Sequence, residues 1–162
     1  MFKRMLPLAL LVAGTLTFSS CKKNDDTPAT PSLYTRLGGN AAITKVVNDF
    51  AGNVVAETQT ANSKLLRTFK PLVDAAKAGD PTRANNLVNN LINQIGQATG
   101  GPEKYMGKDM MTAHKGMKIT DDEFTALVNE LVKALDKNSV PSQEKTELLT
   151  ILGGLKGQIV GQ

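Results

Sequence analysis

A short segment around the only histidine of the chain constrains the fold more than any other part of the sequence. Its Gly-Gly-Pro run at 100–102 must end the helix before it, because glycine is a poor helix former and proline lacks an amide hydrogen. A Tyr-x-Gly turn at 105–107 follows, and then a short helical run carries His114, with Met110 and Met111 one turn earlier. The segment therefore predicts a helix break followed by an apolar helical face with one nitrogen ligand.

The composition favours an all-α fold. The chain has 162 residues, of which 41% are hydrophobic, and this suits one domain with one core. Tryptophan is absent and the aromatic share is 4%. The apolar residues are mostly leucine, valine, isoleucine and alanine, and they recur at helical spacing at 43–54, 65–76, 87–95, 124–135 and 148–160. We therefore expect these stretches to be helices that bury one face each.

Several residues predict helix ends. Asn40 can cap the helix over 43–54, and an Asp-Pro pair at 80–81 can start the helix before the Gly-Gly-Pro break. Thr120 and Glu123 form a capping box, in which each side chain accepts a hydrogen bond from the other residue's backbone. Two glycines at 153–154 weaken the last helix, where we expect a slight bend.

The charge distribution gives no sign of a nucleic-acid partner. The formal net charge is +4, and Lys3 and Arg4 of the N-terminal leader contribute two of these charges. The remaining basic residues are scattered singly along the predicted helices, without the clustered stripe and stacking aromatic residues that nucleic-acid binding needs. We expect no nucleic acid among the partners.

Residues 1–20 read as a secretory signal, because two basic residues precede an apolar run at 5–12 that is too short to stay in a membrane. The leader ends in Phe-Ser-Ser before Cys21, similar to a bacterial lipobox with phenylalanine at the usual leucine position. Cys21 is thus the expected lipidation site, and an ordinary signal with a free thiol is the alternative. Residues 21–31 predict a flexible tether and 32–162 the folded domain, which would be anchored in a bacterial envelope, at the outer membrane, facing the periplasm or the surface.

Two blocks of the domain resemble the group I truncated (two-over-two) haemoglobins. The first is Leu-Tyr-x-Arg-Leu-Gly-Gly at 33–39, and the second runs from Gly-Gly-Pro at 100–102 through Tyr-x-Gly to Met-x-x-His-x-Gly-x-x-Ile-Thr at 111–120. The resemblance implies a truncated-globin fold with an inserted helix at about 63–80, before the distal helix. We interpret the insertion as a helix packed on the surface, with pocket covering or partner binding as the alternatives.

The same resemblance implies haem b held non-covalently, with His114 as the iron ligand; without it, a lone histidine among apolar residues is more often a hydrogen-bonded core residue. On the distal side, the family normally has a tyrosine after a phenylalanine, and here Ala51 follows Phe50. The remaining expected contacts are Leu87 and Leu91, the second at a position where the family often has glutamine, together with Ile95, Met110 and the family tyrosine Tyr105. A register error of one residue would bring Asn90 and Gln94 inward, and Arg83 and Lys108 are candidates for the haem propionates.

The resemblance implies a protein that binds a diatomic gas: oxygen, with nitric oxide and carbon monoxide as further candidates. Reaction of nitric oxide with bound oxygen is known in the family and would need an electron donor that the sequence does not identify. Because Ala51 and Leu91 replace the usual polar residues, we expect weak retention of oxygen and gas binding rather than turnover. The alternative is a haem-free helical lipoprotein that acts as an interaction module in the envelope. A zinc enzyme or hydrolase would lack ligands and nucleophiles.

Overall fold

The structure of the protein, a computed structural model, describes residues 30–162. The expected signal and Cys21 lie outside these residues. The described part forms seven α-helices and one 3-10 helix, with no strand. They are α1 (Leu33–Arg36), α2 (Gly39–Glu57), α3 (Leu66–Lys77), α4 (Thr82–Ala98), α5 (Met110–His114), α6 (Asp121–Lys137), α7 (Ser142–Gly153) and η1 (Lys156–Gln158). The predicted all-α fold is confirmed.

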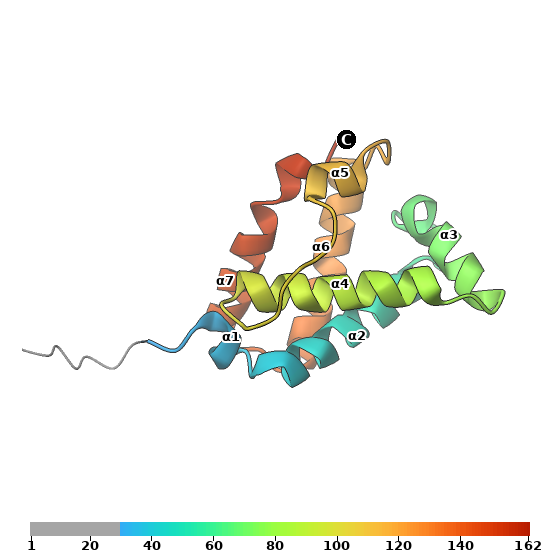
Figure 1. The fold of residues 1–162 in the computed structure, drawn as a ribbon. Coiled ribbons are helices and arrows are strands. Elements are labelled where there is room, and N and C mark those ends of the chain that lie inside the picture. Colours follow the sequence, from blue (N-terminus) through green and yellow to red (C-terminus); the bar gives the residue numbers. More distant parts are fainter. Residues whose placement is uncertain (1–29) are drawn as a thin grey trace, which may run out of the picture.

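Two helix pairs build the domain (Figure 1). Helix α2 packs against α4 and against α6, and α6 packs against α7. The pair α2 and α4 therefore faces the pair α6 and α7, which is the two-over-two arrangement that the sequence predicted. Helix α3 lies at one end of α2 and α4, and the short helix α5 lies above α4 in the view, near the C-terminus (Figure 1). None of the helices in the described part is long and apolar enough to span a bilayer.

The core lies where these helices meet, and the apolar stripes of the sequence supply it. Val47 of α2 is completely buried, as are Leu135 of α6 and Leu148 of α7 to within two per cent of their surface. Fully burying an aliphatic side chain of this size contributes about 1.5–3 kcal/mol. The buried cluster joins five helices and consists of Leu33, Ile43, Val46, Val47, Ile92, Ile95, Leu131, Ala134, Leu135 and Leu148.

The Gly-Gly-Pro break brings the sequence blocks at 33–39 and 100–120 together in space. Gly100 has φ +88°, a conformation that only glycine adopts readily, and it ends α4. A side chain at Gly101 would overlap the ring of Tyr34 in α1. The Tyr34 amide donates to the Thr99 carbonyl over 2.8 Å, and its hydroxyl donates to Glu103 Oε1 over 2.8 Å. The glycines thus let α1 dock directly on the end of α4.

Two of the predicted helix ends differ from the structure. Helix α2 begins at Gly39 after Gly38, and the prediction that Asn40 caps it is wrong. Asn40 instead donates its amide hydrogen to the Tyr34 hydroxyl and its side-chain amide to Glu103. The last apolar stretch is two elements rather than one bent helix, because α7 ends at Gly153 and η1 follows. The capping box at the start of α6 is confirmed.

Candidate functional site

The imidazole of His114 is held in one orientation at the end of α5. Its Nδ1 lies 2.7 Å from the backbone oxygen of Met110, one turn earlier. Since a carbonyl oxygen can only accept, Nδ1 carries a hydrogen, and in the neutral imidazole the lone pair is then on Nε2. Among the described residues, no hydrogen bond reaches Nε2. This is the tautomer of a histidine that binds a metal through Nε2 while its other nitrogen is fixed by a hydrogen bond.

Helix α5 has partners on both sides. Asp109 caps it by accepting a hydrogen bond from the Thr112 amide over 2.9 Å, which lowers the pKa of Asp109. From α4, the side-chain amide of Gln94 lies 3.3 Å from the sulfur of Met110. Gln94 therefore sits on the side of α4 that faces α5. Helix α5 also packs against η1 near the C-terminus.

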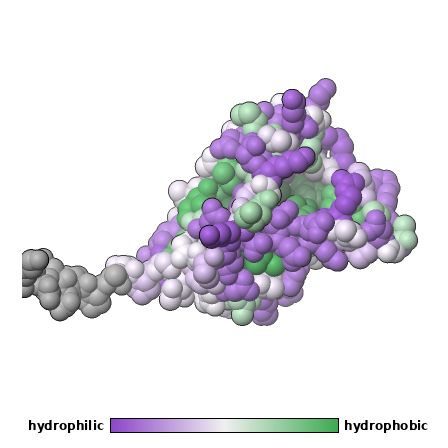
Figure 2. All heavy atoms as spheres, viewed as in Figure 1, coloured by the Kyte–Doolittle hydropathy of each residue, from purple (hydrophilic) through white to green (hydrophobic). Residues whose placement is uncertain are grey.

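A cavity of about 110 Å³ lies between α2, α3 and α4. It contains four of the residues that the sequence predicted for the site: Phe50, Ala51, Leu87 and Leu91. All of its lining residues are apolar, and the others are Val47, Val54, Val55, Phe69, Leu72, Val73, Ala76, Ala84 and Val88. In the space-filling view, hydrophobic side chains line a recess between the positions of α4, α5 and α3 (Figure 2).

The residues around this recess fit a flat, apolar, metal-bearing group. Leu87, which lines the cavity from α4, is 47% exposed, although it is a large apolar side chain. Such exposure on a monomer is typical of a surface that a ligand covers. His114 is not among the residues that line the cavity; it lies on α5 beyond α4, and its Nε2 has no hydrogen bond within the described residues. Apolar walls with one histidine are what a haem needs from a protein.

Three predicted site residues have other positions or partners in the structure. Ile95 is 1% exposed and packs in the core, where it borders a second cavity with Ile43 and Leu148, so it does not line the apolar cavity. The Tyr105 hydroxyl donates to the Lys108 carbonyl over 2.7 Å and its ring covers Gly107, so this tyrosine closes the turn before α5. Burial raises the pKa of Tyr105. Met110 accepts a hydrogen bond from His114 Nδ1 at its backbone oxygen and contacts the Gln94 amide through its sulfur.

The inserted helix has a larger role than the sequence indicated. Four residues of α3 line the apolar cavity, so the expectation of a helix merely packed on the surface is incomplete, and the pocket-covering alternative describes its apolar side better. The apolar stripe at 65–76 was the available signal. The stripe alone could not tell which surface it covers, because a helix packed on the outside shows the same spacing.

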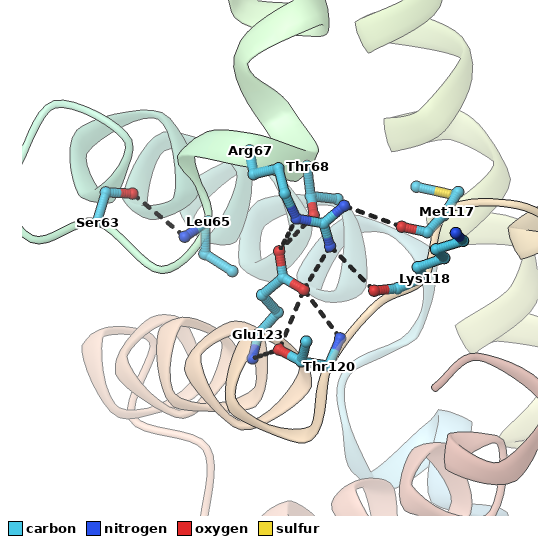
Figure 3. Close-up of polar contacts among 8 residues, drawn as sticks. All are labelled: Ser63, Leu65, Arg67, Thr68, Met117, Lys118, Thr120 and Glu123. Atoms are coloured by element: carbon cyan, nitrogen blue, oxygen red, sulfur yellow. Dashed lines mark hydrogen bonds and ion pairs between the residues drawn. The ribbon is translucent and has the colours of Figure 1, made fainter. Parts of the chain in front are cut away.

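Glu123 joins the inserted helix to α6 (Figure 3). Its carboxylate accepts from Arg67 at both oxygens, over 2.9 and 2.6 Å, and from Thr68 over 3.1 Å. It also accepts from the backbone and side chain of Thr120 in the capping box. Burial acts to raise the pKa of Glu123, which is 7% exposed, but the bonds from Arg67, Thr120 and Thr68 outweigh it and lower the pKa to about 2.

These features define the class of the protein. A two-over-two globin has two facing helix pairs and a histidine on a short separate helix. Both are present here, together with an apolar cavity lined by the pair α2 and α4. The sequence model of the bacterial-like globin family matches residues 32–160, and the chain belongs to this family.

Curated relatives agree with this assignment. The chain is 30% identical over 128 residues to the group 1 truncated hemoglobin GlbN of Mycolicibacterium paratuberculosis, covering 79% of this chain and 83% of the relative. It is 25% identical over 132 residues to a group 1 truncated hemoglobin of Tetrahymena thermophila, covering 82% of this chain and 97% of the relative.

Solved structures agree with the fold. The truncated hemoglobin of Tetrahymena pyriformis in its Fe(III) form superimposes with a TM-score of 0.66 at 24% identity, covering 82% of this chain and all of that one. The 2/2 hemoglobin of Synechococcus sp. PCC 7002, solved in the cyanomet state with covalently attached heme, gives a TM-score of 0.62 at 26% identity, covering 79% of this chain and 95% of that one.

Replacing Glu123 by glutamine should make the free energy of unfolding depend less on pH between about 4.5 and 2. The folded pKa of about 2 lies below the unfolded value near 4.5, so this carboxylate stabilises the fold above about pH 4.5 and loses its contribution as the pH falls toward 2. The upper limit of that contribution is about 3 kcal/mol. Glutamine keeps the capping box but removes the charge.

The measurement is the urea midpoint at pH steps between 2 and 7. Asp122→Asn is the matched control, because Asp122 is the exposed neighbour of Glu123 and pairs only with the exposed Lys64. Its curve should run parallel to that of the wild type. Parallel curves for Glu123→Gln as well would show that the Arg67–Glu123 pair contributes nothing to acid stability.

Proposed function

We propose that this globin binds haem b non-covalently through Nε2 of His114 and takes up a diatomic gas at the iron. The observation that carries the proposal is the hydrogen bond from Nδ1 to the Met110 carbonyl, which leaves Nε2 as the free nitrogen. The sequence has no second histidine and one cysteine, at position 21, so neither a second histidine ligand from the same chain nor a Cys-x-x-Cys-His attachment is available.

Haem iron supplies the bond to the gas when it is bound, and the chain supplies the surroundings. His114 would hold the group through Nε2, with its imidazole fixed by the hydrogen bond from Nδ1 to the Met110 carbonyl. The apolar side chains of α2, α3 and α4 exclude water from the distal cavity.

The distal cavity supports weak rather than strong retention of oxygen. Ala51, Leu87 and Leu91 lie in it, and none of its lining side chains carries a hydrogen-bond donor. Bound oxygen carries partial negative charge and gains from a donor, whereas carbon monoxide gains less. Gln94 is the reserve donor, since its amide now bonds only to the Met110 sulfur, a weak acceptor. We therefore infer a gas-binding role rather than a dioxygenase role for nitric oxide.

Deleting the imidazole tests the haem site. The chain from residue 21 onward, purified and supplied with hemin, should show a Soret band that shifts on reduction with dithionite. His114→Ala should lose the ligand-dependent spectrum, and added imidazole should restore it, because a free imidazole can occupy the vacated position. Met111→Leu is the control and should keep the spectrum. A colourless wild type would favour the haem-free interaction module, and an unchanged His114→Ala spectrum would exclude this histidine as the ligand.

Placing a hydroxyl in the distal cavity tests the gas-binding proposal. Ala51→Tyr should slow oxygen dissociation about tenfold, because one hydrogen bond to the bound ligand is worth about 1–1.5 kcal/mol. Ala51→Phe is the matched control, since it adds the ring without the hydroxyl. The measurement is stopped-flow displacement of oxygen by carbon monoxide. Equal slowing in both variants would mean that the ring blocks the exit and that Ala51 does not face the ligand as proposed.

We also propose that lipid on Cys21 anchors the protein to a bacterial envelope membrane. The support is the order of the leader: basic residues, an apolar run and small residues directly before the single cysteine. Expressed from its full sequence, the wild type should partition into detergent, whereas Cys21→Ser should stay in the aqueous phase. Mass spectrometry of the mature N-terminus is the second measurement. An unmodified Cys21 on a cleaved chain would establish an ordinary secretory signal instead.

A further inference from the structure

One guanidinium reaches from the inserted helix to two other parts of the molecule (Figure 3). Arg67 binds the Glu123 carboxylate at the start of α6, as described above. It also donates from Nη1 to the Met117 carbonyl over 3.0 Å and from Nη2 to the Lys118 carbonyl over 3.2 Å. These two carbonyls belong to the corner that joins the histidine-bearing helix α5 to α6. Arg67 therefore contacts the segment that begins three residues after His114.

The corner at residues 116–118 is a tight turn that needs outside partners. Gly116 has φ +82° and Lys118 has φ +49°, an uncommon conformation for a residue with a side chain. The C-terminal residues hold its other side, where the Lys118 amide donates to the Gln162 carbonyl over 2.6 Å and the Gly161 amide donates to the Ile119 carbonyl over 2.9 Å. Arg67 binds the carbonyl groups that the C-terminal segment leaves open.

Helix α3 depends on this contact as well. None of its residues is fully buried, so its apolar side gives it only a shallow hold on α4 and α2. Its N-terminal end is held by Leu65, which directly precedes α3 and is 1% exposed, and by polar bonds. Glu57 of α2 accepts from the Ser63 hydroxyl over 2.6 Å and from the Lys64 amide over 2.8 Å, and Glu123 accepts from Thr68. The position of its apolar residues over the cavity follows from how this end is fixed.

We propose that Arg67 is a positioning residue that couples the distal wall of the gas-binding cavity, helix α3, to the corner that orients His114. The proposal rests on the haem site proposed above. Through four hydrogen bonds, a single side chain sets the distance between α3 and the α5–α6 corner. Helix α3 and the α5–α6 corner then keep a fixed position relative to each other in the haem-free protein.

Arginine suits this position and lysine does not. The bonds point in three directions within one plane, from Nε, Nη1 and Nη2, which matches the fixed fork of a guanidinium. A lysine would keep the attraction to Glu123 but could not reach the carboxylate and both carbonyls together. Charge alone is therefore not enough, and Arg67→Lys separates the coupling from the ion pair.

The test of the coupling needs no haem. In the haem-free protein, hydrogen exchange should rise at least about tenfold in residues 66–77 and in residues 115–119 together for both Arg67→Ala and Arg67→Lys, because both lose the shared bonds. Thr68→Val is the matched control, since it removes a bond to Glu123 from the neighbouring position and leaves the corner alone. It should leave exchange in 115–119 unchanged.

A rise confined to 66–77 in both Arg67 variants would overturn the proposal, because Arg67 would then only attach α3. Normal exchange in Arg67→Lys would also overturn it, since charge would then be enough. Should Arg67→Ala fail to fold, Arg67→Lys decides alone.

In the hemin-loaded full chain, Arg67→Lys should release hemin to an acceptor apoglobin at least about fivefold faster than the wild type. The control Thr68→Val should stay within about twofold of the wild type. Equal release rates for Arg67→Lys and the wild type would overturn the role of Arg67 at the haem site. If the Arg67 variants show the joint rise in hydrogen exchange but the wild type never binds hemin, the proposed function is rejected and the coupling is still supported.

Discussion

Helix α5, which carries His114, is too short to be stable without its neighbours. Helix α5 has five residues, and isolated helices shorter than about 12–15 residues are marginal in water. Its geometry is therefore imposed by its neighbours: Asp109 caps its first turn, Gln94 reaches it from α4, and Arg67 and Gln162 fix the corner that follows. The orientation of His114 is thus a property of the whole domain, and residues far from α5 can change it.

The two sequence blocks that resemble truncated haemoglobins meet at one place, and only the second of them contains His114. Tyr34 of the first block packs against Gly101 of the second, and its hydroxyl donates to Glu103. Asn40 donates to the same carboxylate oxygen. This contact fixes the end of α4 beside α1, and so it sets the starting point of the segment that leads to α5. The residues of the first block that carry the resemblance therefore stabilise the fold and do not contact the site directly.

Features decided by near neighbours could be predicted from the sequence. The capping box of Thr120 and Glu123 is an example, because both partners lie within one turn. Asn40 was assigned wrongly for the opposite reason: its groups bond to Tyr34 and Glu103, and the second of these lies 63 residues away. The position of α5 and the set Phe50, Ala51, Leu87 and Leu91 followed from the resemblance, which carries tertiary information that spacing lacks.

Long-range pairs were invisible at the sequence level. Arg67 and Glu123 are 56 residues apart, and nothing in either segment marks the partner. Ile95 shows the same limit within one helix. It follows Leu87 and Leu91 at helical spacing, yet the cavity face and the core face of α4 lie next to each other, so one further step along the stripe turns the side chain from the cavity into the core.

The distribution of polar groups links the architecture to the chemistry. The hydrogen bonds that hold α3 and the residues before it come from Glu57 and from the Arg67–Glu123 pair, none of which lines the cavity, and the cavity itself has only apolar walls. Polar groups outside the cavity can fix α3 without touching a ligand. Inside the cavity, a gas molecule meets only dispersion forces, which differ little between small diatomic molecules. Under the proposed function, discrimination among gases would rest on the bond with iron at His114, with the Gln94 amide as the reserve donor.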